Sequence, residues 1–290
     1  MTAGSGALQF KMVRELLRSR EVRDAEGLFA AEGLKIFEEV PAEAVREVFV
    51  SEAFAKEHGG LLRDMPYTVV SDKRFGSISD TKNPQGVIAV LKKPVWDLAK
   101  VLGSGLSSGN GGVDGITAEK NSESSSAFGN GGEKAGKLFL AAEHLQDPGN
   151  AGTILRTAEA AGADAVFFTK DSVDIFNPKV VRSTMGSIFR MPVFYVENAA
   201  GLAETFRKYS VRSYAAYLPG STVYDEPDYT GGTCFFIGNE SRGLTEEAAE
   251  AADARIRIPM TEKINSLNAA MAAGILLYEA ARQRRNKEQR

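Results

Sequence analysis

The second half of the chain alternates short apolar runs with helical segments, and this alternation limits the possible folds more than any other feature. Apolar runs of strand length end near residues 145, 169, 196, 218, 238 and 259, and segments with helical periodicity lie between most of them. Parallel strands need a long crossover between them, which a helix supplies. From residue 137 onward the sequence therefore predicts an α/β fold, with a mostly parallel sheet and helices on both of its faces.

A segment of low complexity divides the chain. Residues 103–136 are rich in Gly and Ser and have no apolar periodicity, so burial would not offset the entropy lost on ordering them. Before this segment, residues 11–40 have helical periodicity, and residues 47–54, 67–71 and 86–92 have the pattern of short strands. We therefore expect a small α/β domain at residues 1–102, a flexible linker at 103–136 and a larger α/β domain at 137–290.

Composition excludes several kinds of chemistry. Cys234 is the only cysteine, and His58 and His144 are the only histidines, so one chain cannot assemble a disulfide framework or a zinc site of nitrogen and sulfur ligands. We expect no metal. The N-terminus has no leader pattern and no apolar run is long enough to span a membrane, so we expect a cytoplasmic protein without a membrane partner.

Two basic segments, residues 11–23 and 281–290, could bind nucleic acid locally although the formal net charge is -3. Each also fits a solvated helix face.

A first cluster of polar residues and glycines follows the strand that ends near residue 145. In "DPGNAGTILRTA", residues 147–158, Gly149 and Gly152 allow a tight turn, and the helix that follows presents free N–H groups at its start. The stretch also fits an ordinary turn in which Asn150 caps the helix. It does not have the G-x-G-x-x-G spacing of dinucleotide-binding folds.

Three further clusters follow later strands. In "FFIGNESRGL", residues 235–244, an acid and a base stand between two glycines at the end of a strand, which is more than a plain turn needs. In residues 255–274, Pro259 ends a strand, and Ser266 or Asn268 can open the last helix. Lys179 and Arg182, in "NPKVVRSTMGSIFR", could bind phosphate or lie on the surface without a role.

Together these segments resemble the signature motifs of the SpoU family of SPOUT-class RNA methyltransferases. The resemblance covers residues 137–284 and rests on "DPGNAGTILRTAEAAGA", "IGNESRGL" and "RIPM...INSLNAAMAAGI", with "NPKVVRSTMGSIFR" between the first two. The N-terminal region, through "LFAAEGLKIFEEV", resembles the substrate-binding domain of many family members, which is similar to small ribosomal RNA-binding proteins.

The resemblance implies a deep trefoil knot, a homodimer and S-adenosylmethionine as cofactor, with a ribose 2′-hydroxyl of RNA as acceptor. The residues that match catalytic positions of the family are Arg156, Asn150, Glu240, Ser266 and Asn268. Those expected to bind the cofactor are Gly238, Asn239, Gly243, Ile258, Met260 and Leu267. For RNA binding we expect Lys11, Arg14, Arg18, Lys179 and Arg182.

An N-terminal domain of ribosomal-protein type favours large-subunit (23S) ribosomal RNA as the substrate. Transfer RNA is the alternative substrate, and a non-catalytic RNA-binding protein on the same fold is the alternative function. A nucleotide-dependent oxidoreductase is a further alternative that the missing G-x-G-x-x-G spacing disfavours. Because a guanidinium stays protonated in proteins, we assign Arg156 the role of holding a phosphate and stabilising the developing alkoxide, rather than the role of a base.

Overall fold

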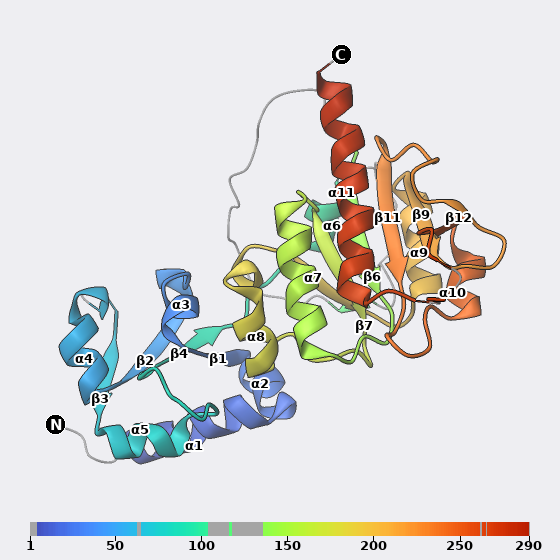
Figure 1. Ribbon diagram of the computed structural model, residues 1–290. Coiled ribbons are helices and arrows are strands. Elements are labelled where there is room, and N and C mark those ends of the chain that lie inside the picture. The colour runs from blue at the N-terminus through green and yellow to red at the C-terminus, as the bar shows by residue number, and fades with distance from the viewer. Residues whose placement is uncertain are drawn as a thin grey trace. The chain divides into compact units, whose positions relative to one another are not determined.

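The computed structural model describes residues 5–62, 65–103, 116–117, 136–261, 263–264 and 266–289 (Figure 1). It divides into two compact units. The N-terminal unit consists of Met1–Pro94 and Asp174–Arg190, and the C-terminal unit of Val95–Val173 and Met191–Arg290. Most of the linker predicted at 103–136 lies outside the described residues.

The N-terminal unit is built on a four-stranded sheet. Its strands lie in the order β1-β4-β2-β3, where β4 is antiparallel to both β1 and β2, and β3 is parallel to β2. The strands are β1 (Leu28–Glu32), β2 (Val45–Ser51), β3 (Tyr67–Val70) and β4 (Val87–Lys92). The helices are α1 (Ser5–Arg18), α2 (Arg20–Glu26), α3 (Leu34–Phe37), α4 (Glu52–His58), α5 (Asp72–Ile78) and α8 (Pro178–Thr184), with the 3-10 turns η1 (Ala42–Ala44), η2 (Gly59–Leu62) and η3 (Ser187–Phe189).

Alternating side chains of this sheet build two separate cores, as the two-residue period of a strand requires. Ala30, Phe49 and Ile88 pack on one face with apolar residues of α1 and α5. Phe29 and Val50 point to the other face, where α3, α4 and α8 contribute. Both faces of the small sheet are therefore covered.

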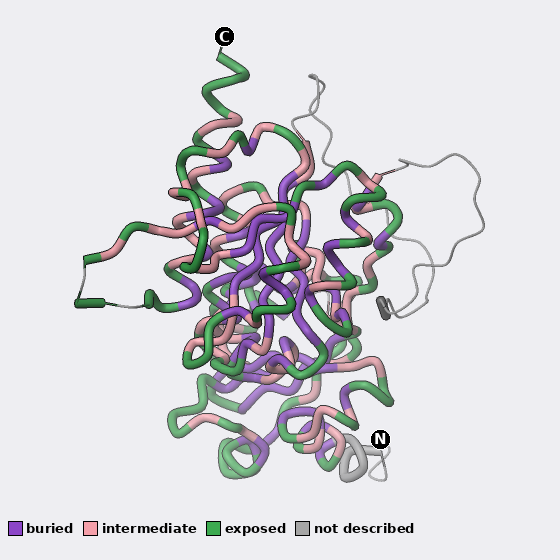
Figure 2. Tube along the Cα trace, turned by 90° about the vertical axis from the view of Figure 1, so that its right-hand side faces the viewer, coloured by how far each residue is buried: buried purple, intermediate pink, exposed green. Residues whose placement is uncertain are grey.

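The C-terminal unit is built on an eight-stranded sheet in the order β10-β12-β9-β11-β6-β7-β8-β5. Every neighbouring pair is parallel except β5 and β8, which are antiparallel. The strands are β5 (Ile116–Thr117), β6 (Leu138–Ala142), β7 (Ala165–Thr169), β8 (Val193–Val196), β9 (Val211–Ala216), β10 (Thr222–Val223), β11 (Gly232–Ile237) and β12 (Ala254–Arg257). The central strands β6, β7 and β11 are buried almost throughout, which Figure 2 shows as the purple centre of the tube.

Helices cover both faces of this sheet. The helices are α6 (Leu98–Leu102), α7 (Pro148–Ala160), α9 (Ala199–Lys208), α10 (Glu246–Ala251) and α11 (Ala269–Glu288). On one face α7 and α11 pack side by side, and α11 also contacts β11 and β6 (Figure 1). On the other, α6, α9 and α10 bury a core rich in phenylalanine that includes Phe139, Phe167 and Phe206. The predicted α/β fold with a mostly parallel sheet is confirmed.

Several sequence-based expectations need correction. The helical periodicity read over residues 11–40 is interrupted by β1, because Phe29, Ala30 and Ala31 are buried on alternate faces of a sheet. The region 47–54 is a strand only to Ser51, whose side chain caps α4 by accepting a hydrogen bond from Phe54 N.

The compact units also differ from the predicted boundaries. Residues 95–102 belong to the C-terminal unit, where Leu98 and Leu102 of α6 join its core. Residues 174–190 belong to the N-terminal unit, because Phe176, Val181 and Phe189 pack into the core beside β1. Apolar periodicity reveals which side chains are buried but not which sheet they are buried against.

Candidate active site

The site lies at the carboxyl ends of β6 and β11. The chain runs from β6 through α7 to β7 on one side of β6, and later strands are added on the other side, so the strand order reverses at β6. Ligands of open α/β sheets bind at such a reversal. Here "DPGN" follows β6, "GNESRG" follows β11, and the loop after β12 leads into α11.

The turn after β6 is set by Asp147 and Pro148. The Asp147 side chain accepts a hydrogen bond from Asn150 N at 2.7 Å and thereby caps α7, while Pro148 occupies the first helical position. The alternative that Asn150 caps this helix is therefore wrong. Because Asp147 fills that role, the Asn150 side chain is free to reach other loops.

A chain of hydrogen bonds connects the three motifs through Asn150. Its Nδ2 donates to Glu240 Oε1 at 2.8 Å, and its Oδ1 accepts from Asn268 Nδ2 at 2.9 Å. Asn268 also caps α11, since its Oδ1 accepts from Ala270 N and Met271 N. Three of the five predicted catalytic residues thus meet in one network, although Glu240 lies 90 positions and Asn268 lies 118 positions from Asn150 in the sequence.

The loop between β11 and α10 folds back on itself. Asn239 and Gly243 exchange two backbone hydrogen bonds of 3.1 and 2.9 Å, and Asn239 Oδ1 accepts from Ser241 N and Arg242 N. Gly243 has φ of +72°, a conformation that favours glycine. A Cβ on Gly238 would lie 1.9 Å from Leu244 N, so only glycine fits where the loop closes.

Both ends of this loop are held by residues 143 and 144, which the sequence analysis did not select. At one end Asn239 Nδ2 donates to the His144 carbonyl at 2.7 Å. At the other, the buried Glu143 carboxylate accepts from Thr245 N at 2.8 Å and from Thr245 Oγ1 at 3.0 Å. An acid directly after a fully apolar strand was the available signal, because a carboxylate is rarely buried there without partners.

We predict that Glu143→Ala lowers the free energy of unfolding by about 2–3 kcal/mol, because Thr245 then keeps a partly buried N–H and hydroxyl without their acceptor. The midpoint of urea unfolding, followed by circular dichroism, measures the change. Glu204→Ala is the control, since Glu204 is an exposed acid on α9. Equal midpoints for the two variants would contradict the role assigned to Glu143.

A histidine–carboxylate pair joins the end of β6 to the loop after β7. His144 has φ of +55°, and its Nδ1 contacts Asp171 Oδ2. Partial burial would raise the pKa of Asp171, but hydrogen bonds from Thr169 and His144 outweigh it and hold that pKa below its usual value. Gln146 Nε2 adds a hydrogen bond to the Asp171 carbonyl at 2.8 Å. These contacts fix the turn that presents Asn150.

The other predicted site residues are placed differently. Arg156 is exposed on α7, and the described residues offer it no hydrogen bond or ion pair. Ser266 is exposed in the loop before α11. Ile258 and Met260 are partly buried after β12, and Leu267 is 37% exposed. The structure thus assembles the amide and carboxylate groups of the site but leaves Arg156 outside their hydrogen-bond network.

The residues predicted to bind RNA all belong to the N-terminal unit. Lys11, Arg14 and Arg18 are exposed on α1. On α8, Lys179 is exposed and Arg182 is 3.6 Å from Asp80. Among the described residues, no group of three or more His, Cys, Asp or Glu side chains is arranged to hold a metal ion.

Known proteins resemble both units. A model of the SpoU rRNA methylase family matches residues 137–278, and a model of the MRM3-like substrate binding domain matches residues 9–89. The chain belongs to the SpoU family. The region matched by the methylase model lies in the C-terminal unit except for residues 174–190, which belong to the N-terminal unit. The predicted substrate-binding domain is confirmed. The chain is accordingly a methyltransferase.

Relatives of this SpoU protein align over much of its length. The 23S rRNA (guanosine(2553)-2′-O)-methyltransferase of Bacillus subtilis is 28% identical over 90% of this chain and 92% of its own. An uncharacterised tRNA/rRNA methyltransferase of Synechocystis is 38% identical over 51% of this chain. That alignment covers only 54% of the relative's own length. An rRNA methyltransferase from Sinorhizobium meliloti, known from a crystal structure with bound AdoMet, is 28% identical in sequence to this chain. The two structures superpose with a TM-score of 0.72, and 97% of each chain is covered.

Proposed function

We propose that this SpoU protein transfers a methyl group from S-adenosylmethionine to a ribose 2′-hydroxyl of large-subunit ribosomal RNA. The observation that carries the proposal is the network of Asn268, Asn150 and Glu240, which joins all three motifs at the carboxyl edge of the sheet. The relative in Bacillus subtilis is a 2′-O-methyltransferase of 23S rRNA, and the one in Sinorhizobium meliloti binds AdoMet.

The residues present fit this cofactor. The loop from Gly238 to Gly243 is so tight that a Cβ on Gly238 would strike its backbone, which leaves main-chain groups to face a ligand. Asn239 is held within the loop by both of its side-chain atoms, so it acts on the cofactor by keeping the loop shape. Ile258, Met260 and Leu267 supply apolar surface for an adenine ring. Bound there, S-adenosylmethionine supplies an electrophilic methyl group on a sulfonium.

The chain's own residues position the ribose. The hydroxyl oxygen must lie in line with the methyl group, and its proton must leave as the new C–O bond forms. Asn150, locked between Glu240 and Asn268, is the group that orients the ribose. Ser266 is exposed two residues before Asn268, and we assign it a contact to the substrate. Arg156 holds a phosphate and stabilises charge on the ribose oxygen.

RNA binding is assigned to Lys11, Arg14, Arg18, Lys179 and Arg182 of the N-terminal unit. These cations lie in the unit that contains the substrate-binding domain, and they would contact phosphates, which attract cations whatever the base sequence. Ribosomal RNA is favoured over transfer RNA because the relatives with long alignments act on ribosomal RNA by name. The methylation then takes place where ribosomes are assembled, which in a bacterial cell is the cytoplasm.

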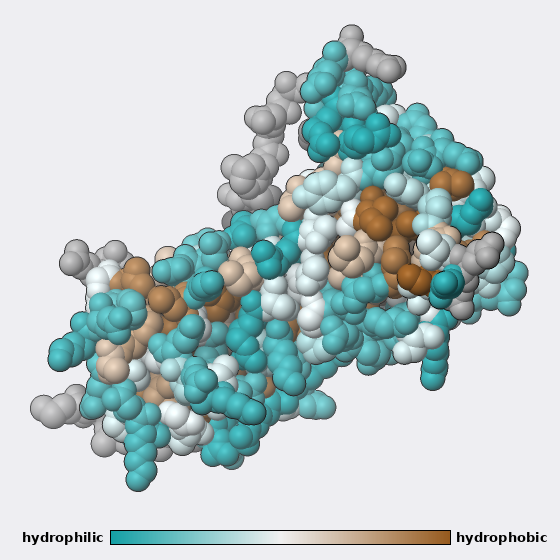
Figure 3. All heavy atoms as spheres, in the orientation of Figure 1, coloured by the Kyte–Doolittle hydropathy of each residue, from teal (hydrophilic) through white to brown (hydrophobic). Residues whose placement is uncertain are grey.

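A homodimer is the proposed assembly, and α11 is its contact surface. Met271 is 62% exposed and Tyr278 is 47% exposed, and their spacing of seven residues places both on one face of the helix. Leu267, just before the helix begins, is also exposed. In Figure 3 the C-terminal end of α11 is hydrophilic, whereas apolar surface is exposed nearer its start. A second copy would cover this surface and could bring groups to Arg156 that its own chain does not supply.

We predict that Met271→Glu shifts the protein from a dimer to a monomer of 31.2 kDa, because a carboxylate would be buried without a partner at the contact. Light scattering on a size-exclusion column measures the mass. Leu218→Glu is the control, since Leu218 is also exposed but lies outside α11. A monomeric wild type, or an unchanged mass for Met271→Glu, would count against this surface. The trefoil knot stays a prediction of the family resemblance.

Methylation with purified protein tests the proposed function. The protein is incubated with labelled S-adenosylmethionine and either unmodified 23S ribosomal RNA or transfer RNA, and methylated riboses are mapped. Transfer of label to riboses of ribosomal RNA is expected. Label only in transfer RNA would establish the alternative substrate. Binding of both RNAs with no label would establish a non-catalytic RNA-binding protein.

A further inference from the structure

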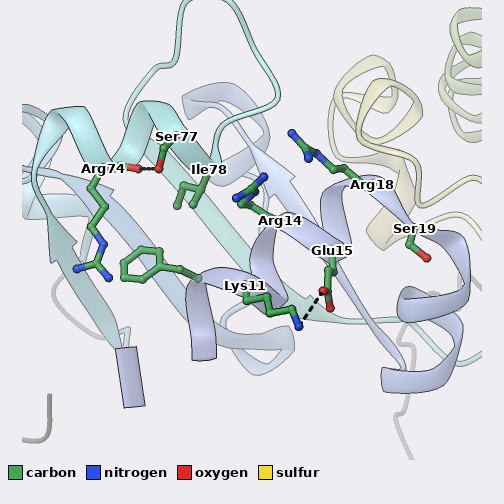
Figure 4. A pocket seen from close by; sticks show the side chains of 9 residues that line it. Lys11, Arg14, Glu15, Arg18, Ser19, Arg74, Ser77 and Ile78 are labelled. Carbon is green, nitrogen blue, oxygen red and sulfur yellow. Dashed lines mark hydrogen bonds and ion pairs between the residues drawn. The ribbon is translucent and has the colours of Figure 1, made fainter. Parts of the chain in front are cut away.

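A groove between α1 and α5 in the N-terminal unit combines an apolar floor with a basic rim. Its volume is about 490 Å³, which lies within the range of small-ligand sites. Figure 4 shows the side chains of both helices that face it. The lining residues are Phe10, Lys11, Arg14, Glu15, Arg18, Ser19, Arg74, Ser77 and Ile78.

The cations of α1 form a row along the groove. Lys11, Arg14 and Arg18 are exposed, while Val13, Leu16 and Leu17 of the same helix are buried against the sheet. At 1.5 Å per residue the row is about 10 Å long, which is enough to follow two or three phosphates of one strand. Glu15 is the single acid of the lining, and it lies 3.8 Å from Lys11.

The guanidinium groups of Arg14, Arg18 and Arg74 form no ion pair in the described part of the chain. By contrast, Arg20 and Arg23 of α2 pair with Asp24 and Asp174. Unpaired guanidinium groups close together repel one another, and a polyanion removes that repulsion. The groove therefore has the charge expected of a surface that binds phosphates.

Arg74 adds a flat surface opposite this row. Its guanidinium carbon lies 4.2 Å from the centre of the Phe10 ring. Arg74 itself is exposed (Figure 4). The guanidinium thus lies over the ring, and because Arg74 is exposed, the group remains accessible to a ligand. Unpaired bases stack on arginine planes in this way, whereas bases within a duplex are already stacked on each other.

We propose that this groove seats an unpaired nucleotide of the substrate RNA, with its base on Arg74 and its flanking phosphates on Arg14 and Arg18. The inference rests on the proposed function, since it assigns a role to RNA that the enzyme must bind. It adds Arg74, on α5, to the cations of α1 and specifies a single-stranded segment. An acidic protein segment would match the charge but would make no use of the flat Arg74–Phe10 pair.

Binding of short RNA to the full-length protein tests the proposal. Fluorescence anisotropy at several salt concentrations compares a 12-nucleotide single strand with the same strand in a duplex, for the wild type, Arg14→Ala, Arg74→Ala and Arg74→Lys. Lys56→Ala is the matched control, because Lys56 is an exposed cation of the same unit on α4, outside the groove. Calorimetry with S-adenosylmethionine and the KM for ribosomal RNA are measured for each variant.

The wild type is expected to bind the single strand more tightly than the duplex. Arg14→Ala should reduce the slope of log K against log salt by roughly 0.7, the value for one contact to a single-stranded phosphate. Arg74→Lys should keep the slope but weaken single-strand binding about tenfold, because lysine retains the positive charge but has no planar guanidinium on which a base can stack. Both variants should raise the KM for RNA, and neither should change the affinity for S-adenosylmethionine.

Three results would overturn the groove assignment. These are equal affinity of the wild type for single strand and duplex, identical behaviour of Arg74→Lys and Lys56→Ala, and displacement of the RNA by polyglutamate of equal total charge at equal concentration. In each case the wild type would still methylate RNA, so the proposed function would stand. A wild type that binds S-adenosylmethionine but methylates neither RNA would instead refute the proposed function.

Discussion

Replacement of Arg156 by alanine is expected to lower kcat for RNA methylation by roughly 10²- to 10³-fold, the range for loss of one charge-stabilising donor. The resemblance to the SpoU family matches Arg156, in "TILRTA", to the family's catalytic arginine, and this role is part of the proposed function. The variant loses the group that we propose holds a phosphate and stabilises the ribose oxygen as its proton leaves. Because the side chain is exposed and has no hydrogen-bond partner among the described residues, the fold should not be affected.

Single-turnover methylation of 23S ribosomal RNA measures the chemical step, and calorimetry with S-adenosylmethionine measures cofactor binding. Cofactor binding should remain at the wild-type level, because none of the residues assigned to the cofactor contacts Arg156 through a hydrogen bond in the described chain. Lys208→Ala, which removes an exposed cation from α9, should retain full activity. Turnover of Arg156→Ala at the wild-type rate would make the assignment wrong.

Arg156→Lys separates charge from geometry at the same position. Lysine keeps the positive charge but cannot form the paired, planar hydrogen bonds of a guanidinium. We expect activity between those of the wild type and the alanine variant. Activity equal to that of the wild type would reduce the role of Arg156 to that of a point charge.

Gly238→Ala is expected to abolish binding of S-adenosylmethionine and to lower the free energy of unfolding by about 3 kcal/mol. The added Cβ would lie 1.9 Å from Leu244 N and 2.0 Å from the carbonyl carbon of Gly243. Both are backbone atoms, so no side-chain rotation relieves the overlap. The loop must open, which breaks the paired backbone hydrogen bonds of Asn239 and Gly243 and shifts Glu240 away from Asn150.

Gly231→Ala is the control for this substitution. Gly231 precedes the same strand β11, and nothing lies within 4 Å of a Cβ placed there. Cofactor affinity by calorimetry and unfolding by urea should both match the wild type for Gly231→Ala. Normal cofactor binding by Gly238→Ala would show that the closed loop is not needed to hold the cofactor.

Much of the C-terminal unit could be predicted from local pattern. The apolar runs ending near residues 145, 169 and 238 became β6, β7 and β11, because a strand buried on both faces needs a continuous apolar run. Asn268 was one of two candidates to open the last helix and is its cap. By contrast, the strand β1 was hidden within helical periodicity, since five residues are too few to establish a period of two.

The sequence by itself determined which residue types stand at each strand end, and through them the motifs of the SpoU family. The tertiary structure decided which of those ends meet. Asn150 joins the other two motifs only because Asp147 caps α7 and because β11 and α11 pack beside β6, which brings Glu240 and Asn268 within 3 Å of it. Such contacts depend on the order of strands in the sheet, a long-range property that local hydrophobic periodicity does not encode.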